Sequence, residues 1–146
     1  MKIVHTKIGI VHRDITFTNI FRYTDKLILN DWGCATSIDK EVSFSGALKY
    51  APDHILKSII QHKSMEINYK PKASDDLEAI VKLLYSRMNS MYVTIKQTPE
   101  NITEHSSILL NFWSNELAPA IWQNLLKLAR ETNYTQLYIE IKKLIA

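Results

Sequence analysis

The sequence predicts a mainly helical domain that carries one small β-hairpin. Glycine and proline are scarce, with three Gly and four Pro in 146 residues, so long flexible linkers are not expected. Apolar residues recur at helical spacing in the C-terminal half, whereas two short apolar runs near the N-terminus flank a polar dipeptide. At this length, and with 46% hydrophobic residues, we expect one domain spanning residues 1–146.

Short apolar runs alternate with turns in the first 33 residues, which predicts strands. The runs are Ile8–Val11, Ile20–Tyr23 and Leu27–Leu29. Thr24 and Asp25 separate the last two runs and predict a tight turn. From Cys34 to Asp53 neither the helical nor the strand period persists, so a long loop is expected there.

The best-defined helix is predicted to start with Ser74 as its N-cap. Asp75 and Asp76 follow in the first turn, where negative charge meets the positive end of the helix dipole. The predicted apolar face, at positions i, i+3, i+4 and i+7, consists of Leu77, Ile80, Val81 and Leu84.

Two further helices are predicted near the C-terminus. One buries Trp122, Leu125, Leu126 and Ala129. The other begins near Asn133, with Gln136 in a capping-box position, and buries Leu137, Ile141, Leu144 and Ile145. Between 89 and 115 the apolar positions are scattered and Pro99 interrupts them, although Ile108–Trp113 fits a short buried helix.

Composition excludes several classes of protein. The net charge of +3 is spread along the chain, so no nucleic-acid partner is expected. A small group of lysines would attract an anionic partner or form a solvated loop: Lys57, Lys63, Lys70 and Lys72. The single Cys34 excludes an internal disulfide, and neither a secretion signal nor an apolar run long enough to span a membrane is evident. We expect an intracellular protein, cytoplasmic or nuclear, without membrane contact.

The loop before the predicted hairpin and the turn after it carry the candidate chemistry. If the two strands pair, Asn19 before the first and Asp31 after the second lie at the same open end and face each other. Their amide and carboxylate oxygens are hard ligands of the kind that Mg²⁺ prefers. Asp14, in the loop that leads to this end, would accept a proton from an attacking hydroxyl or orient it.

These motifs resemble the C-terminal lobe of a eukaryotic-type protein kinase. The family's catalytic loop reads HRD, four residues and Asn, and its metal-binding turn reads DFG; this chain has HRDITFTN at 12–19 and DWG at 31–33. GALKYAPD at 46–53 resembles the end of an activation segment, and SDDLEAIVKLLY at 74–85 resembles the buried helix after it. The catalytic loop is similar to the divergent fungal-type branch. The resemblance implies a catalytic loop and activation segment at 9–53 and a helical subdomain at 54–146.

The resemblance also implies roles for individual residues. Asp14, Arg13 and Asn19 would be catalytic, and Asn19 with Asp31 would hold ATP and Mg²⁺. Structural support would come from His12 and Trp32, which stack, from Asp76, which anchors the catalytic-loop backbone, and from Asp53 paired with Arg130. Several of these residues also have a simpler interpretation: His12 and Trp32 as core packing, and Asp76 as a helix N-terminal charge. Taken separately, Asp14, Asn19 and Asp31 would be solvated loop residues.

Several departures from the family pattern bear on activity. The family's ATP pocket uses a Gly-rich loop and a strand Lys upstream of the catalytic loop, whereas eleven residues precede His12 here. We therefore expect the N-terminal lobe to be absent and ATP affinity to be poor in this chain alone. Thr16 stands where a Lys commonly neutralises the transferring phosphate. Ala47 lacks the hydroxyl that braces the catalytic Asp, unless Ser45 substitutes, and Asp53 is one methylene shorter than the usual Glu.

Three functions remain open at this point. The first is a protein kinase that acts on a protein substrate, with the N-terminal lobe supplied by another chain. The second is a catalytically inactive kinase-fold module, a pseudokinase, that binds a protein partner. The third is a small-molecule kinase of the aminoglycoside or choline type. Arg13 and the GALKYAPD segment are protein-kinase traits and argue against the third function.

Overall fold

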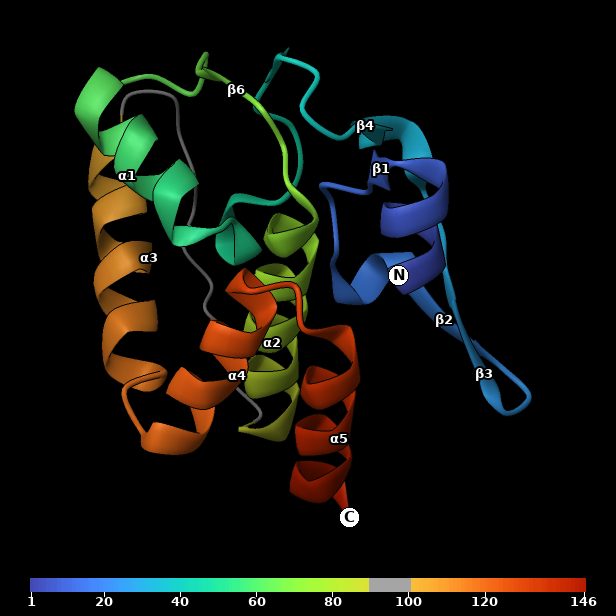
Figure 1. Cartoon of the computed structure of the whole chain (residues 1–146). Helices are drawn as coiled ribbons and strands as arrows, with labels where there is room; N and C mark the ends of the chain where they lie inside the picture. The colour runs from blue at the N-terminus through green and yellow to red at the C-terminus, as the bar shows by residue number, and fades with distance from the viewer. Residues whose placement is uncertain (90–100) are drawn as a thin grey trace.

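The computed structural model describes residues 1–89 and 101–146, and the described part is mostly helical with small antiparallel strand pairs (Figure 1). This confirms the predicted mainly helical class. The segment around Pro99 lies outside the described residues. The helices are α1 (Asp53–His62), α2 (Ala73–Met88), α3 (Ile102–Glu116), α4 (Ala120–Arg130) and α5 (Tyr134–Ile145). Single turns lie at η1 (Val4–Ile8), η2 (Phe17–Asn19), η3 (Trp32–Cys34) and η4 (Leu48–Tyr50).

The predicted hairpin is confirmed. Strands β2 (Ile20–Tyr23) and β3 (Lys26–Leu29) pair antiparallel, with Ile20 opposite Leu29 and Tyr23 opposite Lys26. Thr24 in the turn has a φ of 55°, in the left-handed region that tight hairpin turns require. The hairpin projects away from the helices (Figure 1).

Two shorter strand pairs tie the first half of the chain together. Strand β1 (Ile10–Val11) pairs with β4 (Thr36–Ser37), and β5 (Val42–Ser43) pairs with β6 (Asn68–Tyr69). The strand predicted at Ile8–Val11 is therefore shorter than expected, because Ile8 belongs to the turn η1. The predicted long loop contains β4, β5 and the single turn η4, none of which has enough residues to show a period.

Helix α2 forms the centre of the helical part, between α4 and the loops of the first half of the chain (Figure 1). The prediction that Ser74 caps it is wrong: the helix begins at Ala73, and Lys72 occupies the N-cap position. The reason is that Asp75 reaches back and accepts the Lys72 N–H at 2.9 Å, which places the N-cap two residues earlier than predicted. Leu77 and Val81 are buried as predicted, whereas Ile80 and Leu84 on the same face are half-buried.

The C-terminal helices largely match their predicted faces. All four predicted apolar residues of α4 are buried. Asn133 caps α5 by accepting the Gln136 N–H at 3.2 Å. Leu137 is buried as predicted, whereas Ile141 and Leu144 are half-buried. Ile145 is 60% exposed, contrary to prediction, because it lies at the free end of α5.

Two helices differ from the sequence prediction. Helix α3 is longer than the predicted Ile108–Trp113, and Ile108 is exposed while Leu109 and Trp113 are buried. Helix α1 was not predicted as a separate element; its buried residues Ile55, Leu56 and Ile59 pack it against α3. Within the described part of the chain, no helix is both long and apolar enough to cross a membrane.

Candidate active site

The loop that carries Asp14 is fixed to helix α2 by Asp76. This carboxylate is almost fully buried, and it accepts the His12 N–H through Oδ2 at 2.7 Å and the Arg13 N–H through Oδ1 at 2.9 Å. Arg13 has a φ of 72°, an unfavourable conformation for a residue with a side chain. The two hydrogen bonds hold the loop in this conformation, so Asp76 determines the direction in which the chain enters the site.

His5 is part of this anchor, although the sequence analysis did not single it out. Its Nε2 donates to Asp76 Oδ2 at 2.9 Å, and the Tyr134 hydroxyl donates to its Nδ1 at 2.8 Å. Burial, followed by the negative charge of Asp76, raises the pKa of Tyr134. The backbone of the loop that carries Asp14 is thereby linked to α5, from the opposite end of the chain. A lone histidine near the N-terminus offers no sequence signal for such a role.

Both carboxylate oxygens of Asp14 are oriented by neutral donors. Oδ1 accepts the backbone N–H of Ala47 at 2.8 Å, and Oδ2 accepts the side-chain amide of Asn19 at 2.9 Å. The backbone amide of Ala47 thus braces Asp14 although the expected hydroxyl is missing. Ser45 does not substitute for it, because its hydroxyl contacts Cys34 Sγ at 3.0 Å.

Gly46 allows the segment to approach this closely. It has a φ of 111°, and a Cβ atom at this position would lie 2.2 Å from the carbonyl oxygen of Arg13. Only a glycine fits such a contact without displacing the loop. The GALKYAPD motif therefore starts at the point where the segment touches the loop.

The open end of the hairpin brings Asn19 close to Asp31. The Asn19 carbonyl accepts the Asn30 N–H at 2.8 Å, so the residue directly across from Asn19 is Asn30, and the prediction that Asp31 faces it is wrong by one position. The strand pairing continues one residue beyond Leu29, which accounts for the difference. Asp31 has a φ of 55° and is exposed, and its Oδ1 accepts the Gly33 N–H at 3.4 Å.

The oxygens at this end fit a magnesium ion better than a softer metal. Asn19 uses its amide NH₂ to bind Asp14, which leaves its side-chain oxygen for other contacts, and Asp31 offers an exposed carboxylate. Magnesium takes one or two protein oxygens and completes its shell with phosphate and water. Within residues 1–89 and 101–146, no group of three or more His, Cys, Asp or Glu side chains is placed to hold a metal.

His12 and Trp32 join the two parts of the site. Their rings meet edge to face with centroids 4.7 Å apart. His12 is fully buried and its Nε2 donates to the Asn30 carbonyl at 2.9 Å, while the Trp32 indole donates to the Leu29 carbonyl at 3.1 Å. Trp32 remains 40% exposed, so it is not a core residue in the described structure.

The guanidinium of Arg13 is bound by the segment that follows the hairpin. It donates to the carbonyl oxygens of Cys34, at 3.0 Å, and of Ser43, and to the Tyr69 hydroxyl at 3.2 Å. No acidic side chain in the described part of the chain forms an ion pair with it. Arg13 therefore acts here as a brace for the segment between β3 and α1.

The far end of the same segment is held by a cluster of four charged side chains, which we call the ion cluster: Asp53, Glu78, Lys82 and Arg130. Asp53 lies 2.8 Å from Lys82 and 2.9 Å from Arg130, and Glu78 lies 3.2 Å and 2.9 Å from the same two groups. Lys82 is fully buried and also donates to the Ala51 carbonyl at 2.6 Å. Arg130 reaches Asp53 although the aspartate side chain is one methylene shorter than the glutamate usual in the family pattern.

Within the ion cluster, the neighbouring cations strongly lower the pKa of Glu78. Burial alone would raise the pKa of its carboxyl, but the charge of Lys82, together with the Arg130 hydrogen bond and charge and the Asp53 N–H, lowers this pKa to about 2. Glu78 and Lys82 were not predicted as site residues. Their signal in the sequence was an acidic and a basic residue four positions apart, within a run of α2 that is otherwise apolar from Leu77 to Tyr85.

Comparison with known proteins gives a limited result. No family model and no curated protein matches the sequence. Among solved structures, the chain is similar to the kinase PK-1 of Cydia pomonella granulovirus, with 16% identity and a TM-score of 0.44. The match covers 77% of this chain and 47% of the viral kinase, so the chain spans about half of that protein's length. A similarity of this TM-score and identity does not assign a function to the chain.

Proposed function

We propose that this chain carries the phosphoryl-transfer half of a protein-kinase-type phosphotransferase, which moves a phosphoryl group from ATP to a protein hydroxyl. The observation that supports it best is the position of Asp14. Two neutral donors, the Ala47 N–H and the Asn19 amide, orient its carboxylate, and no cation pairs with it among the described residues.

Such a carboxylate suits the role of a base or an orienting group. Each of its oxygens has a further lone pair, and a substrate hydroxyl would donate to one of them. Protein kinases rely on positioning and electrostatic stabilisation more than on covalent chemistry. The rigid attachment of the loop through Asp76 therefore supports this proposal as much as Asp14 itself does.

Asn19 and Asp31 would hold Mg²⁺ bound to ATP. The ion would neutralise phosphate charge during transfer. The side-chain oxygen of Asn19 and the exposed carboxylate of Asp31 are the donors that this role requires. Thr16 contributes no positive charge, and its hydroxyl lies 2.8 Å from that of Thr18. We therefore expect slow transfer even where ATP binds.

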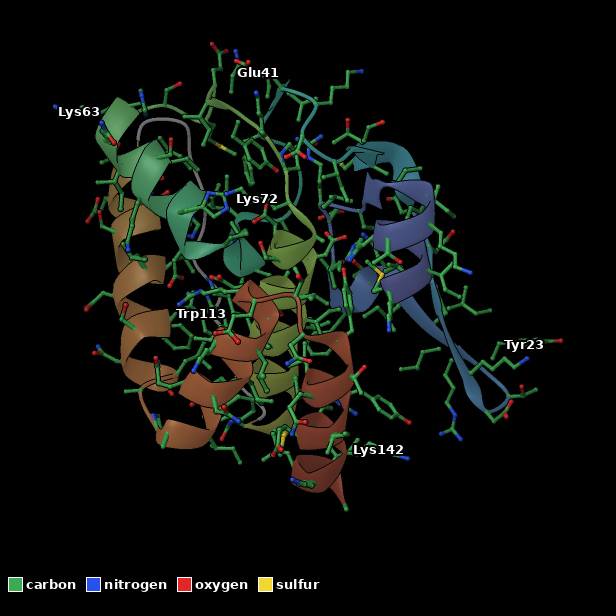
Figure 2. The ribbon with its side chains drawn as sticks, viewed as in Figure 1. Tyr23, Glu41, Lys63, Lys72, Trp113 and Lys142 are labelled. Carbon is green, nitrogen blue, oxygen red and sulfur yellow. The ribbon has the colours of Figure 1, made fainter. Side chains whose placement is uncertain are left out.

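A second candidate function is a partner-binding module without catalysis. The projecting hairpin favours it, because its side chains expose a large apolar surface: Phe21, Tyr23, Leu27 and Ile28 are 47–75% exposed. Tyr23 points away from the rest of the molecule (Figure 2). Exposed apolar patches of this kind usually mark interfaces. The small-molecule kinase remains less favoured, because Arg13 braces a segment that ends in GALKYAPD.

The test of the proposed kinase activity is magnesium-dependent transfer of labelled phosphate from ATP to a mixture of peptides with Ser, Thr or Tyr acceptors. Asp14→Asn and Asp31→Asn are expected to abolish the signal. Asp25→Asn is the matched control, because Asp25 is an exposed carboxylate in the turn of the same hairpin. Transfer that survives Asp14→Asn, or that is absent when the folded wild-type chain is assayed together with a protein-kinase N-terminal lobe, would contradict the proposed activity and favour the partner-binding module.

A further inference from the structure

A hollow of about 430 Å³ lies between α1, the start of α2 and the end of α4, away from Asp14. Its wall includes the ion cluster residues Asp53, Glu78 and Arg130, together with Asp75. The lysines Lys57 and Lys72 line it as well. Both belong to the group of lysines that the sequence analysis singled out, and the proposed function leaves them without a role.

Two carboxylates of the hollow, Asp53 and Glu78, pair with cations of the protein, and the third, Asp75, is hydrogen-bonded. Asp53 and Glu78 share Lys82 and Arg130. Asp75 accepts from His54 Nε2 at 2.9 Å and from the backbone N–H of Lys72 at 2.9 Å. Among the described carboxylates of the hollow, Asp75 is therefore the one without a lysine or arginine partner that an entering anion would meet.

The positive charges of Lys57 and Lys72 are not neutralised in this way. Both side chains are exposed, and neither forms an ion pair within residues 1–89 and 101–146. They come from different elements, Lys57 from α1 and Lys72 from the N-cap of α2. The hollow also includes Ser74 in the first turn of α2, where backbone N–H groups and the helix dipole favour an anion. Two cations and a hydroxyl around one cavity form a suitable site for a phosphate group.

We propose that this hollow binds the phosphate of a phosphorylated serine or threonine in a protein, and this part of the inference rests on the proposed kinase function. Asp14 and the hollow are joined by the segment 47–53, because Ala47 binds Asp14 and Asp53 lines the hollow. The six steps from the Cα of Ala47 to the Cα of Asp53 span at most about 20 Å. An extended substrate of comparable length would reach from the hollow to Asp14, so the site would select proteins already phosphorylated near the acceptor hydroxyl.

The test measures binding without ATP, so that it does not depend on catalysis. The probe is a fluorescent peptide with one phosphoserine, compared with its unphosphorylated form and with inorganic phosphate as competitor, at constant ionic strength. The double variant Lys57→Met/Lys72→Met is expected to weaken binding about tenfold or more, because it removes two charge-assisted contacts. The matched control is Lys63→Met/Lys70→Met, which removes the same charge from lysines that do not line the hollow. In Figure 2, Lys63 lies at the far end of α1 from Lys72.

Each outcome decides the proposal. Tighter binding of the phosphopeptide than of the unphosphorylated peptide, lost only with Lys57 and Lys72, supports it. Equal weakening by both double variants would show general charge attraction and overturn it, as would equal binding of both peptides. Inorganic phosphate that binds as tightly as the phosphopeptide would show a free-phosphate site and overturn the protein assignment. Because the binding assay contains no ATP, a failed transfer assay and a failed binding assay are distinguishable.

Discussion

The two ends of the segment from Gly46 to Asp53 are built on opposite electrostatic principles. At one end the backbone N–H of Ala47 meets Asp14, a half-buried carboxylate held by neutral donors. At the other end Asp53 enters the ion cluster, where two carboxylates and two cations pair with one another. A fully paired carboxylate changes its protonation or its partner only at a large cost. The paired groups of the ion cluster therefore fix the segment, whereas the Asp14 carboxylate remains able to exchange a proton or accept a further hydrogen bond.

Removing Lys82 is the largest expected disruption. Lys82→Ala leaves Asp53 and Glu78 with Arg130 as their remaining cation in the cluster, and it leaves the Ala51 carbonyl without its partner. We expect a loss of about 3–5 kcal/mol in the free energy of unfolding, measured by urea denaturation. The control is Lys127→Ala, which breaks an exposed pair with Glu131 at 3.9 Å and is expected to cost less than about 0.5 kcal/mol. Similar losses in the two variants would contradict the assignment of the ion cluster as the structural end.

Acid is expected to weaken the same end. The pKa of Glu78 is about 2 in the folded chain, against an ordinary value of 4.5 for a glutamate carboxyl in the unfolded chain. The folded state therefore favours the ionised form. Its contribution to stability is complete above about pH 5 and is lost as the pH falls toward about 2, on the order of 3 kcal/mol. Urea denaturation across this range should give a shallower pH dependence for Glu78→Gln than for the wild type. An identical slope in both proteins would show that Glu78 is not the titrating group.

The contact at the other end depends on Gly46. Gly46→Ala places a Cβ against the Arg13 carbonyl at a strained φ, so we expect a loss of about 2 kcal/mol and impaired transfer. Gly9→Ala is the control, because Gly9 also has a positive φ but has no atom within 4 Å of the added Cβ. It is expected to cost about 1 kcal/mol for the backbone strain alone. Equal costs would mean that the close approach to the loop is unimportant.

The smallest effect on stability is expected at Asp31. Its carboxylate is exposed and makes one long hydrogen bond, to Gly33, so Asp31→Asn should change the free energy of unfolding by less than about 0.5 kcal/mol. The same variant is expected to abolish magnesium-dependent transfer. Thermal denaturation and the transfer assay together check this separation. A large destabilisation would place Asp31 among the structural groups instead.

The sequence predicted the local elements that have strong periodicity or turn chemistry. The Thr24-Asp25 turn gave the hairpin, and the apolar spacing gave α4 and α5. The motif spacing also singled out Asp14 and Asn19, which the structure brings within 2.9 Å of each other. These features depend on residues close together in the chain, which is why pattern analysis finds them.

The resemblance predicted two contacts between distant segments, Asp76 with the loop that carries Asp14 and Asp53 with Arg130, but other such contacts were not predicted. His5, Asp76 and Tyr134 come together from three parts of the chain, and no local pattern indicates their hydrogen bonds. Glu78 and Lys82 were hidden because a buried ion pair looks like the polar side of an amphipathic helix until its surroundings are known. The start of α2 was misplaced because Asp75, rather than Ser74, determines the cap.

The most direct test of the central claim is whether a divalent ion with ATP binds at Asn19 and Asp31. Mn²⁺ with ATP is titrated into the isotope-labelled chain, and paramagnetic broadening of backbone amide signals is followed by NMR. The proposed site predicts that signals of residues 19–20 and 30–33 broaden first in the wild type and in Asp25→Asn, but not in Asp31→Asn. Broadening spread evenly over acidic surface residues, or unchanged in Asp31→Asn, would contradict the proposed phosphoryl-transfer site.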